Sequence, residues 1–104
     1  SDDGIVVSQG ETPWYGKEIQ HSLLSVLNNV FDNTYMYSFS NLTYPGGLWC
    51  FTLASKKYHP INDFNADAVD KSGLEFKYYN KGVHTAAFAL PNFIRDGLQH
   101  LLKN

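Results

Sequence analysis

The stretch that decides the fold is Gly4-Ile5-Val6-Val7-Ser8-Gln9-Gly10-Glu11, near the start of the chain. It opens with a short β-branched run without polar alternation, a pattern typical of a strand buried on both faces of a sheet. The polar and glycine residues at 9–11 then break the run. We therefore expect a buried strand over residues 4–8, with a turn directly after it.

A helix is predicted to follow this strand. Thr12 is a suitable N-cap, and Pro13 fits the first helical position because the N–H that proline lacks would have no partner there. Apolar residues then recur with the helical period until about Phe31, which predicts one buried stripe. The stripe consists of Ile19, Leu23, Val26, Leu27 and Val30.

Two further strands are predicted in the middle of the chain. Tyr35, Tyr37 and Phe39 alternate with smaller or polar residues, and residues 48–55 alternate in the same way. In the second of these strands one face carries Trp49, Phe51 and Leu53. The connection between them is short and rich in turn residues, so we expect an antiparallel pair.

The remainder of the chain is predicted to be a loop followed by short helices. Residues 56–82 are mostly polar, with room for one helical turn, and residues 83–90 suit a short helix. Pro91 is expected to start a final helix. The apolar face of that helix would consist of Ile94, Leu98, Leu101 and Leu102.

The order of these elements predicts the α/β class: a buried strand, a helix, an antiparallel strand pair and a C-terminal helix. A strand buried on both faces normally has parallel neighbours, and the sequence contains no second strand of that kind. We therefore expect residues 1–104 to be the C-terminal part of a larger α/β domain. The first strand should then have one edge that is unpaired within this chain.

Composition and charge narrow the function classes. The chain has 104 residues, enough for one domain, and its net charge of −2 with no basic stripe argues against a nucleic-acid binder. No apolar run approaches the roughly 20 residues of a membrane span, and the acidic start Ser1-Asp2-Asp3 is unlike a signal peptide. The single Cys50 excludes an internal disulfide, and the four histidines lack metal-ligand spacing. We expect a cytoplasmic protein without a metal site.

Three separate stretches resemble the spermidine synthases, the polyamine aminopropyltransferase family. They are DGIVVSQGETPW at 3–14, TYPGGLWCFTLASKKY at 43–58, and KYYN at 77–80 followed by HTAAFALP at 84–91. They occur in the family's order and extend over nearly the whole chain. The stretches 47–49 and 55–58 are similar to the bacterial members in particular.

This resemblance implies a Rossmann-like methyltransferase fold preceded by a small β domain. Residues 1–104 would supply its last three strands, while the N-terminal β domain and the nucleotide-binding half would be absent. The family transfers an aminopropyl group from decarboxylated S-adenosylmethionine to putrescine, without a further cofactor. The intact enzyme is expected to be a homo-oligomer. The family's catalytic aspartate and its glycine-rich nucleoside turn have no counterpart here, so no catalytic residue is expected in this segment.

The resemblance does imply three acceptor-binding residues, each with a structural alternative. Tyr44 would line the polyamine pocket, where a phenol can bond an amine while its ring contacts the alkyl chain, or it would merely occupy a turn before Pro45. Gln9 would approach the acceptor through water, or bond local backbone. Trp49 would form an aromatic wall for the alkyl chain, or belong to the core. Glu11 is a further candidate from its charge alone, independent of the resemblance: its carboxylate would attract a cationic amine, or it would simply favour the helix N-terminus.

Two other functions remain open at this stage. The first is an aminopropyltransferase with another acceptor, such as agmatine, a norspermidine-type diamine or spermidine. Asn41 and Leu42 favour it, because the family more often has Ile and Pro before the Thr-Tyr-Pro turn. The second is a non-catalytic assembly module, which describes an isolated chain without a nucleotide site.

Overall fold

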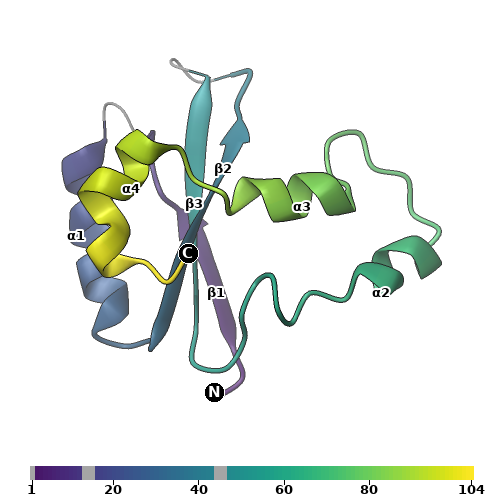
Figure 1. Ribbon diagram of the computed structural model, residues 1–104, viewed down its shortest axis with the longest axis horizontal. Coiled ribbons are helices and arrows are strands. Elements are labelled where there is room, and N and C mark those ends of the chain that lie inside the picture. Colours follow the sequence, from purple (N-terminus) through teal and green to yellow (C-terminus); the bar gives the residue numbers. More distant parts are fainter. Residues whose placement is uncertain (1, 13–15, 44–46) are drawn as a thin grey trace.

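The structure, a computed structural model, describes residues 2–12, 16–43 and 47–104 (Figure 1). Its elements are three strands, four α-helices and one short 3₁₀ helix. They are β1 (Ile5–Gln9), α1 (Lys17–Asn28), β2 (Asn33–Ser40), β3 (Leu48–Ser55), α2 (Ala66–Lys71), α3 (Lys81–Ala87), α4 (Asn92–Leu98) and the 3₁₀ turn η1 (Gln99–Leu101).

The three strands form one sheet in the order β1-β3-β2. β2 and β3 pair antiparallel from Asn33↔Ser55 to Ser40↔Leu48, which confirms the predicted strand pair. β1 pairs antiparallel with the other edge of β3, from Ile5↔Ser55 to Gln9↔Phe51. β1 and β2 therefore run in the same direction with β3 inserted between them.

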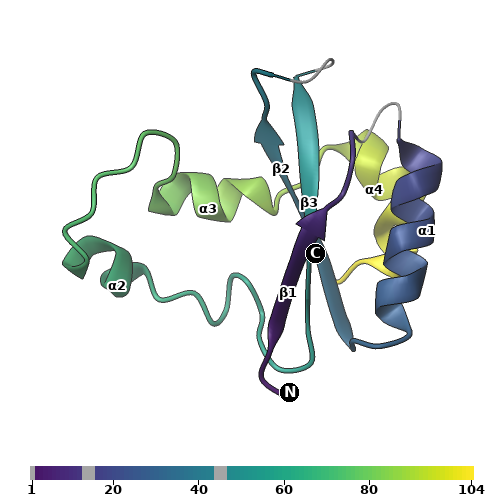
Figure 2. The same cartoon turned by 180° about the vertical axis from the view of Figure 1, so that it is seen from behind.

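The helices cover the two faces of the sheet unequally. α1 and α4 lie on one side and α2 and α3 on the other (Figures 1 and 2). The hydrophobic core fills the space beneath α1 and α4, and it contains Leu24, Met36, Cys50, Leu90, Ile94 and Leu98. The final helix is thus buried through Ile94 and Leu98 as predicted, with Leu101 and Leu102 packed against the edge of the core.

α1 begins later than the sequence predicts. The helix starts at Lys17 with Gly16 as its N-cap, and it ends at Asn28 rather than near Phe31. The carbonyl of Thr12 accepts the N–H of Gly16 at 2.9 Å, so Thr12 closes a separate turn and is not the N-cap. Pro13 lies outside the described residues.

The buried face of α1 is also rotated from the predicted stripe. Its buried residues are Gln20 and Leu24, while Leu23 and Leu27 are only half-buried. Ile19, Val26 and Val30, three members of that stripe, are exposed. The side of α1 that faces the sheet and α4 is therefore narrower than the apolar pattern indicated.

The prediction that β1 is buried on both faces is wrong for this chain. Ile5, Val6 and Val7 are 54%, 41% and 48% exposed. The reason is the position of β1, which has β3 on one side and no strand partner on the other among the described residues. The predicted unpaired edge is confirmed by the same pairing.

The opposite edge of the sheet is covered by the end of the chain. The N–H of Lys103 donates to the Thr34 carbonyl at 2.9 Å. The Asn104 side chain donates to the Met36 carbonyl at 2.7 Å and accepts the Met36 N–H at 2.9 Å. The Asn104 amide thus makes the pair of hydrogen bonds that a neighbouring strand would make. The β2 edge therefore has fewer free backbone hydrogen-bonding groups than the β1 edge.

α2 lies in the stretch expected to be a loop with room for one helical turn, and α3 overlaps residues 83–90, where a short helix is expected. Asn65 caps α2 through the Ala68 N–H, and Asn80 caps α3 through the Val83 N–H. An exposed ion pair between Lys81 and Asp70, at 2.8 Å, links the two helices. In the described ranges, no helix is both long enough and apolar enough to cross a membrane.

The unpaired edge of β1 generates a prediction about association. We expect the 104-residue chain to self-associate through this edge, and Val7→Lys to weaken that association by roughly tenfold, since a charged edge residue resists pairing with another strand. Sedimentation over a concentration series measures the effect. Val26→Lys is the control, because Val26 is an exposed apolar residue on a helix. An equal effect of both variants would show that apolar surface, and not the strand edge, drives association.

Candidate functional site

The sheet brings two of the three predicted acceptor-binding residues to one end. Gln9 is the last residue of β1 and lies opposite Phe51 of β3. Trp49 precedes Phe51 by two positions, so alternation along the strand places it on the same face as Phe51 and Gln9. Gln9 is exposed and Trp49 is half-buried. The two side chains are therefore diagonal neighbours on adjacent strands.

The connection between β2 and β3 starts at this same end of the sheet. β2 ends at Ser40 and β3 begins at Leu48, beside the end of β1. Asn41 shapes the start of the connection, since its side-chain oxygen accepts the Thr43 N–H at 2.9 Å. Tyr44, the third predicted residue, lies outside the described residues.

The backbone just after β1 is held in an uncommon conformation. Glu11 has φ +65°, in the left-handed region that is unfavourable by about 1–2 kcal/mol for a residue other than glycine. The pairing with β3 continues through this turn, because the Gly10 N–H donates to the Cys50 carbonyl at 2.8 Å and the Cys50 N–H donates to the Glu11 carbonyl at 3.0 Å. One such bond contributes about 1 kcal/mol net, so it roughly offsets the strain without exceeding it.

A buried side chain from α1 supplies a second bond to the same carbonyl. Gln20 donates its Nε2–H to the Glu11 carbonyl at 3.3 Å, and Gln20 is fully buried. Its other end, Oε1, is buried without a hydrogen-bond partner among the described residues. An unpartnered buried carbonyl costs about 1–3 kcal/mol, which makes Gln20 an unusual choice for this position.

Glycine is required where α1 meets this turn. A Cβ on Gly16 would lie 2.9 Å from the Glu11 Cβ and 2.9 Å from the Thr12 carbonyl oxygen, closer than side-chain atoms approach. Gly16 is also the N-cap of α1, so Glu11 lies beside the helix N-terminus without belonging to the helix. Both interpretations of Glu11, attraction of an amine and a favourable interaction with the helix, are compatible with this position.

Cys50 lies beneath the turn and is buried. Burial raises the pKa of its thiol to about 12, although a hydrogen bond with the Gln20 side chain acts in the opposite direction. A thiol of this kind stays protonated near neutral pH and is a poor nucleophile. Cys50 therefore acts as a small buried hydrophobic residue of the core.

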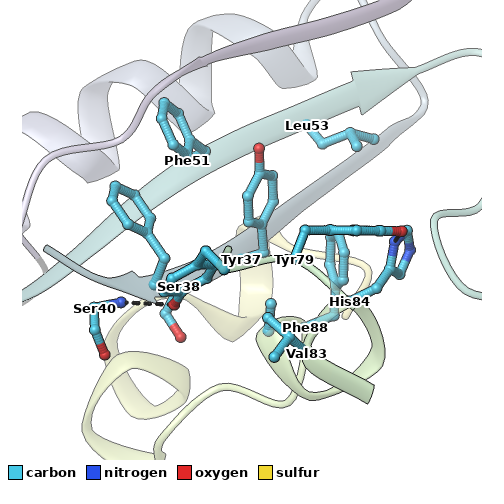
Figure 3. A pocket seen from close by; sticks show the side chains of 12 residues that line it. Tyr37, Ser38, Ser40, Phe51, Leu53, Tyr79, Val83, His84 and Phe88 are labelled. Atoms are coloured by element: carbon cyan, nitrogen blue, oxygen red, sulfur yellow. Dashed lines mark hydrogen bonds between the residues drawn. The ribbon is translucent and has the colours of Figure 1, made fainter. Parts of the chain in front are cut away.

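An aromatic hollow of about 390 Å³ lies between α3 and the sheet (Figure 3). It extends the face that carries Gln9 and Trp49, because Phe51, the partner of Gln9, lines it. Phe39 and Phe51 stack at 4.9 Å, and burial raises the pKa of Tyr37. None of the described lining residues carries a carboxylate to neutralise an ammonium group. The hollow is thus a hydrophobic surface next to the candidate site.

The aromatic residues of the C-terminal segment build the far wall of this hollow. The Ser40 N–H donates to the Tyr78 phenol at 3.0 Å, the bond dashed in Figure 3. Tyr79 and Phe88 also line the hollow, which was not predicted from the sequence. The register of β2 with β3 was the available signal, since it places Tyr37 opposite Phe51 on one face.

His84 holds the tail against the loop after β3. Its Nε2 bonds the Pro60 carbonyl at 2.8 Å and its Nδ1 bonds the Tyr79 hydroxyl at 2.9 Å. A carbonyl only accepts, so the Nε2–H of His84 is the donor to Pro60. The ring also stacks on Phe64 at 3.7 Å. This environment gives His84 a structural role.

Metal-binding clusters are absent from the described part of the chain, where no three His, Cys, Asp or Glu side chains gather as possible ligands. The site residues that the structure describes are instead an amide, an indole and one carboxylate near the end of β1. Such groups can bond and orient a polar ligand with an alkyl chain.

The environment of Cys50 predicts a loss of stability at high pH. The unfolded thiol ionises near pH 9.0 while the native thiol keeps its proton to about pH 12, so the native state binds more protons in that window. The free energy of unfolding of the chain should therefore fall as pH rises, by about 1 kcal/mol between pH 8 and pH 10. Urea unfolding at both values, compared with Cys50→Ala, isolates this contribution. The same pH dependence in both proteins would contradict it.

The sequence is similar to a known domain family and to two curated enzymes. The family model described as the spermine/spermidine synthase domain matches residues 1–66. The polyamine aminopropyltransferase of Clostridium acetobutylicum is 45% identical over 102 residues, which cover 95% of this chain and 35% of that enzyme. The polyamine aminopropyltransferase of Bacillus subtilis is 40% identical over 95 residues, covering 91% and 33%.

Two solved structures are similar over almost the whole chain. Spermidine synthase from Thermotoga maritima superposes with a TM-score of 0.90 at 39% identity, covering 96% of this chain and 36% of that one. A spermidine synthase in complex with the transition-state analogue AdoDATO gives the same TM-score and identity, covering 96% and 34%. The chain spans about a third of the length of the relatives it matches. The predicted resemblance and the partial Rossmann-like α/β fold are confirmed, and the chain belongs to the spermine/spermidine synthase family.

Proposed function

We propose that this chain is a segment of an aminopropyltransferase, a spermidine synthase. The complete enzyme would transfer an aminopropyl group from decarboxylated S-adenosylmethionine to putrescine, giving spermidine and methylthioadenosine. The observation that carries this proposal is the meeting of Gln9 and Trp49 at one end of the sheet, in a chain of this family. Relatives named polyamine aminopropyltransferase support the reaction class.

Catalysis of this transfer depends more on orienting the amine than on activating it. The neutral amine nitrogen attacks the carbon next to the sulfonium, the new N–C bond forms as the C–S bond breaks, and methylthioadenosine leaves with the electron pair. The amine then releases a proton to a base, for which this segment offers no matching residue. Since the sulfonium is a good leaving group in itself, alignment of the amine supplies a large part of the rate. No further cofactor is needed.

The segment would contribute one wall of the acceptor site. The Trp49 indole is suited to contact with a tetramethylene chain near an ammonium group. The exposed amide of Gln9 can accept a hydrogen bond from an amine, either directly or through water. Tyr44 would add a phenol from the connection between β2 and β3. None of these groups is itself an acid or base near neutral pH, so their proposed role is binding.

A second acceptor remains a candidate because of the residues before the Thr-Tyr-Pro turn. The Asn41 side chain accepts the Thr43 N–H, and Leu42 is fully exposed. A different turn geometry would change the length of the acceptor pocket, which separates putrescine from agmatine, a norspermidine-type diamine or spermidine. Kinetics of the complete enzyme with these amines would decide between them.

The partners and location follow from the same proposal. The ligands are small molecules, an amine acceptor and the nucleoside donor, with no nucleic acid or membrane. We expect the complete enzyme to be a homo-oligomer in the cytoplasm. The absence of a basic stripe in the sequence and its net charge of −2 support a small-molecule function.

The proposal predicts that the isolated segment does not catalyse transfer. The purified 104-residue chain, given putrescine and decarboxylated S-adenosylmethionine, should form no methylthioadenosine above background, because no residue here matches the base or the nucleoside site. Mass spectrometry of the reaction measures the product, with the complete Bacillus subtilis polyamine aminopropyltransferase as positive control. Turnover by the chain alone would refute its assignment as a non-catalytic wall.

A second prediction concerns Tyr44 in the complete enzyme. Tyr44→Phe keeps the ring and removes the hydroxyl. The lost hydrogen bond should weaken transition-state binding by about 1–3 kcal/mol, which corresponds to a roughly 5- to 150-fold lower kcat/KM for putrescine. Tyr44→Ala should cost more, because the alkyl chain also loses its wall.

Donor affinity should stay nearly unchanged in both variants. Tyr58→Phe is the matched control, since it removes a phenol from the loop after β3 and should leave putrescine kinetics intact. If Tyr44→Phe instead weakened donor binding, or changed nothing while the fold was preserved, Tyr44 would be only a turn residue.

A further inference from the structure

The turn at the end of β1 is held from two directions. From the sheet, the Cys50 N–H donates to the Glu11 carbonyl at 3.0 Å. From the helix, Gln20 donates its Nε2–H to the same carbonyl oxygen at 3.3 Å. Glu11 stays at φ +65° between them, a conformation that its side chain disfavours. The surroundings therefore impose this conformation on the turn.

Gln20 is poorly suited to a purely structural role. It is fully buried, and its Oε1 lacks a partner among the described residues. An apolar side chain of similar size would fill the same space without burying an unpartnered carbonyl. The amide adds a donor to the Glu11 carbonyl and a hydrogen bond with the Cys50 thiol beneath the turn, and both contacts point to control of the turn geometry.

The turn controls the direction of the side chains next to it. Gln9 directly precedes it and Glu11 belongs to it, and Gln9 shares a face of the sheet with Trp49. Side chains alternate between the two faces of a strand, so a change of backbone angle at the end of β1 would turn Gln9 away from this face. Small displacements of this kind reduce binding and rate because they misplace the groups that orient the substrate.

We propose that Gln20 is a positioning residue for the acceptor amine: its amide locks the left-handed turn at Glu11 and so aims Gln9 and Glu11 into the acceptor site. This inference rests on the proposed function. Gln20 touches no substrate and acts only through the backbone of the turn. Its loss should therefore affect binding of the amine and spare the donor.

The test is made in the full-length protein that contains this segment. Gln20→Met keeps a long unbranched side chain and removes the amide. We expect KM for putrescine to rise about 3- to 10-fold, the effect of one lost hydrogen bond, while KM for decarboxylated S-adenosylmethionine stays unchanged. The melting temperature should stay equal or rise, since the unpartnered carbonyl is gone. Leu24→Met, one turn further along the buried face of α1, is the matched control and should alter neither KM.

A double-mutant cycle separates positioning from packing. Glycine adopts positive φ without strain, so in the Glu11→Gly background the turn no longer depends on the amide. Gln20→Met should then change the putrescine KM by less than about twofold relative to Glu11→Gly alone. Hydrogen exchange gives a second readout, because the Cys50 amide should exchange faster in Gln20→Met while the Ala54 amide on the same strand keeps its protection.

Contrary outcomes are distinguishable. An active enzyme whose putrescine KM ignores Gln20→Met, or in which the effect is the same in both backgrounds, would overturn the positioning role and leave the proposed function intact. A lower melting temperature with unchanged kinetics would assign Gln20 to the core alone. A full-length protein that forms no methylthioadenosine would overturn the proposed function, and the acceptor role of Gln20 with it.

Discussion

The hydrogen bonding of β3 on both of its edges is the constraint on which the rest of the structure depends. Leu48–Ser55 pairs with β1 on one side and with β2 on the other, and it is antiparallel to both. The buried side chains Cys50, Thr52 and Ala54 alternate along one face of this strand and fix which face receives α1 and α4. A shift of one residue would move them all to the other face, so core and site share one register.

The candidate site is a consequence of that register at one end of the strand. Cys50 is the residue at which the regular β1–β3 ladder gives way to the turn, since its carbonyl and N–H bond Gly10 and Glu11. Cys50 therefore contacts the core through its side chain and the turn through its backbone. A change in core packing at the Cys50 side chain would therefore shift the backbone of Gly10 and Glu11, next to Gln9.

The sequence predicted the strand pair well and the helix boundary poorly, for a physical reason. Alternation in β2 and β3 is a local pattern that survives in any context, and the pairing from 33 to 55 follows from it. The start of α1 depends on residues far apart in sequence. Thr12 and Pro13 satisfy the local rules for a helix start, but the left-handed Glu11 and the contact between Glu11 and Gly16 divert the chain first. No window of neighbouring residues contains the Cys50 and Gln20 donors that hold this turn.

The wrong predictions of burial share one cause, although they fall on two different surfaces. They fall on β1, on the outer side of α1 and just after α1, at Ile5, Val6, Val7, Ile19, Val26 and Val30. Apolar periodicity indicates that one face of an element is hydrophobic. It does not indicate which segment packs against that face. The described residues supply no segment that covers these side chains on either surface. The same pattern was reliable in α4, where Ile94 and Leu98 meet a core that the chain itself provides. Periodicity therefore identified the hydrophobic faces of β1, α1 and α4 correctly. It predicted burial correctly only for the face of α4, which packs against other segments of residues 1–104.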